Sequence, residues 1–184
     1  MISKNKIYNF GIEDIIKNKI SINNNKINIL EIGAYCGSSS SWLIDNYLHH
    51  DESSITIIEP FSENSAKIAP IHFKKYELFI DDIKKVLYPE KVILYKDKSI
   101  TVLPELLNDK KQYDIIFING SYLLQDIYED IEMCWDLLKI DGYLFIDKYN
   151  KSLIDEIFQS FIKNKKDSYQ ITLNENIIIV KKLI

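Results

Sequence analysis

The sequence contains no arginine: all 23 basic residues among its 184 are lysine. Together with the abundance of Ile, Asn, Lys and Tyr, this absence indicates mutational bias in an AT-rich genome. It also has a chemical consequence, because the planar guanidinium fork that grips anions with two parallel hydrogen bonds is missing. An anionic ligand must therefore be held by lysine, by hydroxyl groups or by backbone amides.

Cysteine and long apolar runs are also scarce. Cys36 and Cys134 lie far apart and form no Cys-x-x-Cys pattern, which argues against a disulfide framework or a zinc site and fits a reducing compartment. The opening residues MISKNKIYNF lack the continuous apolar stretch and cleavage site of a signal peptide. No apolar run approaches the ~20 residues that span a bilayer. We therefore expect a cytoplasmic protein without a membrane partner, in the host cytoplasm if the chain is viral.

The overall composition is that of a globular domain. Hydrophobic residues make up 46% and charged residues 27%, and the length suits one domain with one sizeable core. The net charge of −4 argues against nucleic acid as the main partner, and a homodimer is left open. We expect a single domain over residues 1–184, with an N-terminal helical extension at 1–26 and a core at 27–183.

Short apolar runs alternate with helical patterns along the chain. The runs predict strands at 27–32, 55–58, 92–95, 113–118 and 143–146, followed by a hairpin of strands at 169–173 and 177–183. Helical spacing predicts helices at 7–20, 38–49, 77–87, 99–107, 123–138 and 151–163, with an irregular segment at 62–76 and a turn at 141–142. This alternation predicts an α/β fold: a mostly parallel sheet, covered by helices on both faces, with one antiparallel strand from the hairpin.

The glycine loop is the segment EIGAYCG at residues 31–37, between the first strand and the first helix of the core. Gly33 and Gly37 allow the backbone to turn sharply and to approach a ligand closely. The following helix presents free N–H groups and a positive dipole end. The spacing is neither the dinucleotide pattern G-x-G-x-x-G nor a P-loop. Glu59 ends the second strand, where an acid can accept hydrogen bonds from a ribose diol.

Five segments in order carry a resemblance to a known family. They read EIGAYCGSSSSWL, ITIIEPF, KSITVLPELL, YDIIFINGSY and LLKIDGYLFIDKY. Over residues 27–183 the chain resembles small class I (Rossmann-like) S-adenosylmethionine-dependent methyltransferases, a group that includes sugar O-methyltransferases and relatives of catechol O-methyltransferase. The resemblance implies a three-layer fold with a seven-stranded sheet, S-adenosylmethionine as cofactor and S-adenosylhomocysteine as product. It also implies transfer of a methyl group to a small acceptor, with a sugar or glycan-precursor hydroxyl as the first choice.

The resemblance also assigns the cofactor half of the site. It places the glycine loop residues Glu31, Gly33, Ala34, Tyr35 and Gly37 along the methionine part, with Ser38 or Ser39 near its carboxylate. It places Glu59 at the ribose hydroxyls and Pro60 and Phe61 beside the adenine. Asp97, Lys98 and Ser99 replace the Gly-Asp-Ser that often surrounds the adenine amine, and Asn119 lies at the mouth of the transfer site.

The acceptor half departs from the family pattern. Metal-dependent members carry an acid after the fourth strand and an acid pair after the fifth, where this chain has Asn119 and then Asp147 and Lys148. Because an ammonium repels Mg²⁺, we expect no metal. Lys148 could then polarise the substrate hydroxyl or, if neutral, act as base; Asp147 is another candidate base, and Tyr122 could orient the hydroxyl. Two alternatives stay open: a cofactor-binding protein with degenerate catalysis, and a methyltransferase acting on protein or RNA.

Overall fold

The computed structural model describes residues 13–21, 25–61, 75–121, 123–147, 159–163, 165, 168–174 and 177–184. Within these residues, seven strands form one sheet in the order β3-β2-β1-β4-β5-β7-β6. The strands are β1 (Asn28–Ile32), β2 (Ser54–Ile58), β3 (Val92–Tyr95), β4 (Tyr113–Ile118), β5 (Leu138–Asp147), β6 (Tyr169–Asn174) and β7 (Ile177–Lys182). Strands β1 to β5 pair in parallel, and β7 runs antiparallel to both of its neighbours. The predicted sheet with one reversed strand is confirmed.

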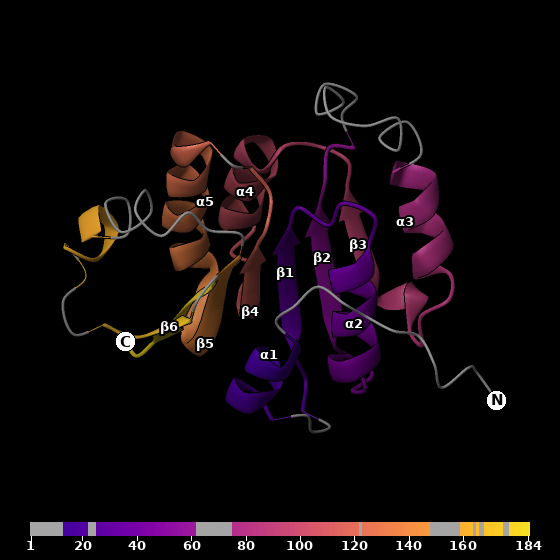
Figure 1. Cartoon of the computed structure of the whole chain (residues 1–184), viewed down its shortest axis with the longest axis horizontal. Helices are drawn as coiled ribbons and strands as arrows, with labels where there is room; N and C mark the ends of the chain where they lie inside the picture. The colour runs from indigo at the N-terminus through magenta and orange to yellow at the C-terminus, as the bar shows by residue number, and fades with distance from the viewer. Residues whose placement is uncertain are drawn as a thin grey trace.

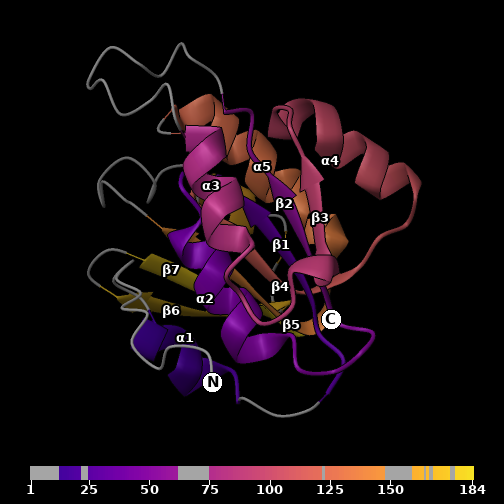
Figure 2. The same ribbon diagram turned by 90° about the vertical axis from the view of Figure 1, so that its right-hand side faces the viewer.

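Helices cover both faces of this sheet (Figures 1 and 2). One apolar cluster joins the sheet to α1 (Glu13–Lys19), α2 (Ser38–Tyr47) and α3 (Lys75–Ile83). A second cluster, on the opposite face, joins it to α4 (Ser99–Asn108) and α5 (Leu124–Leu137). A short 3₁₀ turn, η3 (Pro89–Lys91), precedes β3. The result is the three-layer arrangement expected of alternating strands and helices. None of the described helices has both the length and the apolar character needed to cross a membrane.

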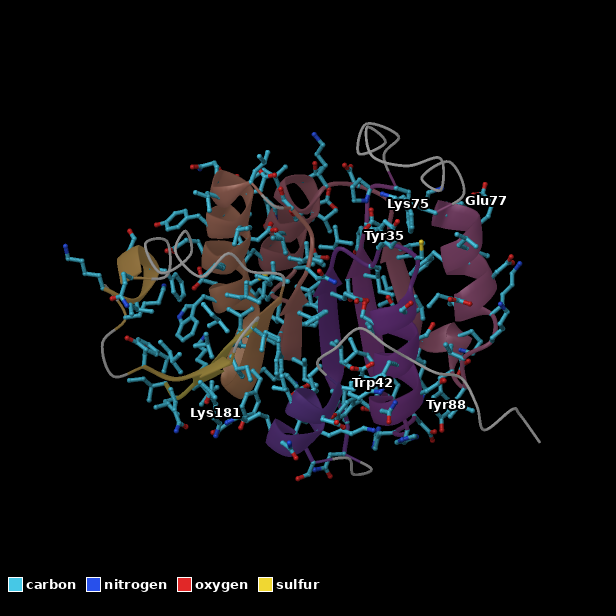
Figure 3. All side chains as sticks on the ribbon, in the orientation of Figure 1. Tyr35, Trp42, Lys75, Glu77, Tyr88 and Lys181 are labelled. Carbon is cyan, nitrogen blue, oxygen red and sulfur yellow. The ribbon has the colours of Figure 1, made fainter. Side chains whose placement is uncertain are left out.

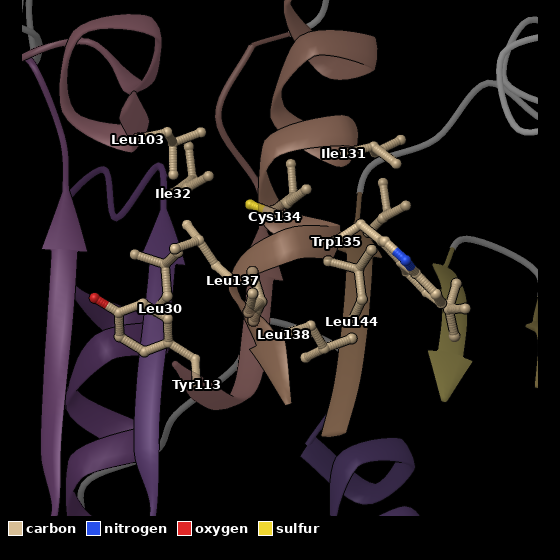
Figure 4. Packing of buried hydrophobic residues seen from close by; sticks show 14 of the residues in the cluster. Leu30, Ile32, Leu103, Tyr113, Ile131, Cys134, Trp135, Leu137, Leu138 and Leu144 are labelled. Carbon is tan, nitrogen blue, oxygen red and sulfur yellow. The ribbon is translucent and has the colours of Figure 1, made fainter. Parts of the chain in front are cut away.

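The period of two along each strand sends its side chains alternately to the two clusters. In β1, Leu30 and Ile32 enter the cluster under α4 and α5, which Figure 4 shows from close by, whereas Ile29 enters the one under α1 to α3. Glu31 therefore faces α2, and it is fully buried there. This charged residue in the apolar layer is the first structural indication of a functional site.

Two boundary predictions were wrong. Helix α3 begins at Lys75 and ends at Ile83, so it starts within the segment expected to be irregular and stops before 87. The turn expected at 141–142 lies inside the continuous strand β5. Leu138 pairs with Tyr113 and Tyr143 pairs with Ile115, so the residues between them bulge out before pairing resumes. Of the predicted helices at 7–20 and 151–163, residues 7–12 and 151–158 lie outside the described residues.

The strand order reverses between β1 and β4, which are neighbours in the sheet but whose following helices cover opposite faces. In open α/β sheets this switch point opens a crevice beyond the carboxyl ends of the strands. The glycine loop continues from β1 and Asn119 follows β4, so both lie at this switch point.

Candidate active site at the switch point

The glycine loop is joined directly to the tips of β2 and β4. The Gly33 N–H donates to the Ile58 carbonyl at 2.9 Å, and the Asn119 N–H donates to the Ile32 carbonyl at 2.8 Å. Gly33 has φ +86°, and a Cβ built there would lie 2.4 Å from the Asn119 carbonyl oxygen. Only glycine fits at position 33, because any side chain would collide with the Asn119 backbone. Gly33 therefore allows the loops after β1 and β4 to pack directly against each other.

Glu59 ties the end of β2 to the same loop. Its Oε2 accepts the Tyr35 N–H at 2.9 Å, and its Oε1 accepts the Phe61 N–H at 3.0 Å. Tyr35 and Phe61 both have positive φ, so each backbone turn is held by this one carboxylate. Each carboxylate oxygen has a further lone pair for a ligand hydroxyl. Glu59 thus joins the glycine loop to the turn after β2, and its contact with a ribose stays a prediction.

Glu31 lies against the first turn of α2. Its carboxyl accepts hydrogen bonds from the Ser39 and Ser40 hydroxyls in the first turn of α2. Burial raises its pKa from 4.5 to about 7, and the two serine hydrogen bonds oppose that rise. Glu31 thus anchors the start of α2 to β1 from below the loop.

Asn119 contributes a buried acceptor at the end of β4. Within the described part of the chain, its side-chain oxygen has no hydrogen-bond partner and no contact with solvent. An unsatisfied buried polar atom costs about 1–3 kcal/mol, which a ligand with an N–H or O–H donor would recover. This unpartnered oxygen lies in the loop that packs against Gly33, at the switch point of the sheet.

Aromatic side chains pack together beyond Glu59. The Phe61 ring lies 5.2 Å from that of Tyr76 and 5.3 Å from that of Phe79. The ammonium of Lys96, from the loop after β3, lies 3.6 Å from the centroid of the Tyr76 ring. Pro60 is exposed beside them. Such flat apolar surfaces suit an adenine ring, as the resemblance implied for Pro60 and Phe61.

The loop after β3 is held from the side of α5. Ser99 begins α4, and its hydroxyl hydrogen-bonds the buried carboxylate of Asp130 on α5. Burial raises the pKa of Asp130 from 3.8 to about 6, and this hydrogen bond opposes the rise. Lys98 is exposed, and its N–H donates to the Asp97 carboxylate at 2.7 Å. The Ser99 hydroxyl is therefore already hydrogen-bonded within the protein. A direct contact between this hydroxyl and adenine stays a prediction.

The remaining predicted residues divide between the two halves of the site. Ala34 is buried under the loop, and Ser38 is exposed at the start of α2. Asp147 ends β5, but its side chain lies outside the described residues, as do Tyr122 and Lys148. Among the side chains that the structure describes, no three His, Cys, Asp or Glu residues converge as ligands for a metal ion. The residues predicted for the cofactor half lie at the ends of neighbouring strands, and the binding roles of both halves stay predictions.

Sequence reasoning missed several residues of this region. Ser40 belongs to a run of serines at residues 38–41. The helix predicted there was the available signal, because it places neighbouring serines in the first turn after the glycine loop. Lys75, Tyr76 and Lys96 carry no local pattern, because they reach the site through the packing of α3 and the loop after β3. Asp130 could not be distinguished from the other acidic residues of the amphipathic helix α5 by sequence alone.

Comparison with known proteins identifies the class of this site. A family model described as a methyltransferase domain matches residues 30–149, which run from within β1 to just beyond β5. The chain belongs to this methyltransferase family and is an S-adenosylmethionine-dependent methyltransferase. A search of curated proteins found no match.

Solved structures share the fold at low sequence identity. The O-methyltransferase from Bacillus cereus in complex with S-adenosylhomocysteine is 17% identical, with a TM-score of 0.64 over 93% of this chain and 79% of that one. TomG, an O-methyltransferase from Streptomyces achromogenes in complex with S-adenosylmethionine, is 15% identical, with a TM-score of 0.66 over 92% and 77%. An rRNA methylase from Streptococcus thermophilus is 12% identical, with a TM-score of 0.65 over 97% and 99%. These likenesses confirm the Rossmann-like methyltransferase fold.

Proposed function

We propose that this methyltransferase methylates a hydroxyl oxygen of a small acceptor, with a sugar or glycan precursor as the preferred class. The observation that carries the proposal is the junction of the glycine loop with Asn119, which joins a nucleoside-binding crevice to the expected transfer site. The solved O-methyltransferases with S-adenosylhomocysteine and S-adenosylmethionine support the choice of an oxygen acceptor.

The chain's residues have mainly a positioning role in this proposal. When bound, S-adenosylmethionine supplies a methyl group already activated on a sulfonium. Glu59 would hold the ribose, Phe61 and Tyr76 would flank the adenine, and Asn119 would accept a hydrogen bond from the ligand. These contacts would hold the methyl group in line with the acceptor oxygen, and a base of this chain would accept the hydroxyl proton. Holding the two reactants in line supplies much of the rate enhancement.

We further propose that the reaction needs no metal ion. Asn119 is neutral where metal-dependent relatives carry an acid, and Lys148 brings a positive charge next to Asp147. Lys148 would take over the polarisation of the acceptor hydroxyl, Asp147 or neutral Lys148 would accept its proton, and Tyr122 would orient it. The support for this assignment is the residue types at the ends of β4 and β5.

The test uses the full chain, S-adenosylmethionine with a deuterated methyl group, and a panel of sugar nucleotides, catechols and peptides. We expect mass spectrometry to find the label on a hydroxyl acceptor, and turnover to persist in excess chelator. Activity that disappears with chelator and returns with Mg²⁺ would contradict the metal-free assignment. Calorimetric binding of the cofactor with no labelled hydroxyl product would favour degenerate catalysis instead.

An RNA acceptor is the second candidate, because one protein of the same fold is an rRNA methylase. The net charge of −4 weakens it, since RNA binding depends on neutralising phosphates. Label transferred to total RNA but to no small hydroxyl compound would favour this candidate.

A further inference from the structure

Strand β3 forms an open edge of the sheet and carries an exposed apolar side chain. Within the described residues it pairs with β2 on one side only, and Figure 2 shows it at the near edge of the sheet, between α3 and α4. None of its four residues is buried, and Ile93 is 48% exposed. Leu87, before the strand, and Ile100, in α4, are also exposed. An open apolar edge of this kind is a template for pairing with another strand.

The backbone of β3 fixes which groups face outward. The Glu59 N–H donates to the Tyr95 carbonyl at 3.1 Å, so Tyr95 turns its carbonyl toward β2. Because successive residues of a strand turn their backbone groups to opposite sides, the N–H and C=O of Leu94 point away from β2. Residues 92–95 contain no proline and no charged residue, the two residue types that usually block pairing at a sheet edge.

We propose that β3 pairs with β3 of a second copy of this chain, antiparallel, about a twofold axis at Leu94. Each Leu94 N–H then donates to the Leu94 carbonyl of the other copy, as a closed twofold contact requires. The same register sets Ile93 opposite Tyr95 of the second copy, twice, on the face that α4 covers. A β-branched side chain beside an aromatic one is a favourable cross-strand pair. The inference does not depend on the identity of the methyl acceptor.

Charges at the two ends of β3 complement each other in this arrangement. Glu90 precedes the strand and Lys98 follows it, and both side chains are exposed. Antiparallel pairing brings the amino end of one strand beside the carboxyl end of the other. Glu90 of each copy therefore approaches Lys98 of the other, which gives two ion pairs of the same kind.

Two other lysines near this edge already have contacts within their own chain. The Lys91 ammonium donates to two carbonyls just beyond α2 and lies 4.3 Å from the centroid of the Tyr88 ring, which Figure 3 shows at the amino end of this edge. The Lys96 ammonium lies over an aromatic ring of α3. The Glu90 and Lys98 charges therefore decide how the two edges attract each other.

The first test measures the mass of the full chain without cofactor by sedimentation velocity. We expect twice the chain mass of 21.6 kDa at protein concentrations on the order of 100 μM, because a pair of short strands gives a modest interface. Ile93→Lys places a charge on the edge and should give a monomer. Ile140→Lys, at a 62% exposed residue of β5, is the matched control that should stay dimeric. A monomeric parent chain, or a dimeric Ile93→Lys variant, would overturn the proposal.

A charge exchange separates pairing at this edge from a loss of folding. Glu90→Lys and Lys98→Glu should each raise the dissociation constant of the dimer roughly 2- to 30-fold, the effect of losing two exposed ion pairs. The double variant restores opposite charges between copies and should return the constant to that of the parent. Because the two residues lie at opposite ends of one strand, this rescue requires a second copy. A double variant that dimerises no better than the single variants would overturn the proposal, even if Ile93→Lys failed to fold.

Discussion

Replacing Gly33 by alanine tests the contact on which the whole crevice depends. The new Cβ would lie 2.4 Å from both the Asn119 oxygen and the Gly120 Cα, and 2.6 Å from the Asn119 carbonyl carbon. All three neighbours are backbone atoms, so one of the two loops must move. The φ of +86° adds a separate penalty, because a side chain disfavours that region.

The expected cost follows from these two terms. Left-handed backbone costs a non-glycine residue about 1–2 kcal/mol, and forcing an extra methyl group into packed surroundings costs about 1–3 kcal/mol. We therefore expect Gly33→Ala to lower the free energy of unfolding by about 2–5 kcal/mol. For a chain of this size, a loss of about 3 kcal/mol lowers Tm by ~6–12 °C.

Urea denaturation followed by tryptophan fluorescence is a suitable assay, because both tryptophans, Trp42 and Trp135, are buried. Gly120→Ala is the matched control in the facing loop. Its Cβ would come no closer than 3.3 Å, to a methyl group of Ile32, so we expect a change below about 1 kcal/mol. Equal losses in the two variants, or a Gly33→Ala variant as stable as the parent, would refute the close approach of the loops.

Two buried acids make stability depend on pH. The pKa of Glu31 rises from 4.5 to about 7 in the folded chain, so the folded state binds the extra proton and loses roughly 3 kcal/mol of stability as pH rises through this window. Glu31→Gln should remove that slope in denaturation measured at several pH values; an unaltered slope would contradict the burial of the acid. The pKa of Asp130 rises from 3.8 to about 6, so the folded state also loses stability as pH rises between these values. Asp130→Asn should therefore make the free energy of unfolding less dependent on pH in this range. An unchanged pH dependence would contradict the contribution of Asp130.

Part of the fold and the site follows from local sequence. The β-branched runs are hydrophobic over four to six residues and are broken by glycine or polar turns, so they predict strands without any tertiary information. The spacing of Gly33 and Gly37 predicts a tight loop for the same local reason, and the structure gives both residues positive φ. Glu59 could be placed because the end of a strand determines which edge of the sheet a side chain reaches.

Other properties were decided only by contacts between distant segments. The continuous strand through residues 141–142 exists because β4 supplies pairing partners on both sides of the bulge, which outweighs the turn preference of Asp-Gly. The burial of Glu31 against the serines of α2 is such a property, and its raised pKa depends on that burial.

The glycine loop combines both kinds of information. Its glycines, its length and its position after β1 were determined by the sequence, because backbone freedom is a property of single residues. Its charge was decided by tertiary structure, since Lys75 lies 40 residues beyond Tyr35 in the chain and reaches its ring only when α3 packs beside α2. Electrostatic recognition depends on distances through space, and those distances exist only once the layers have assembled.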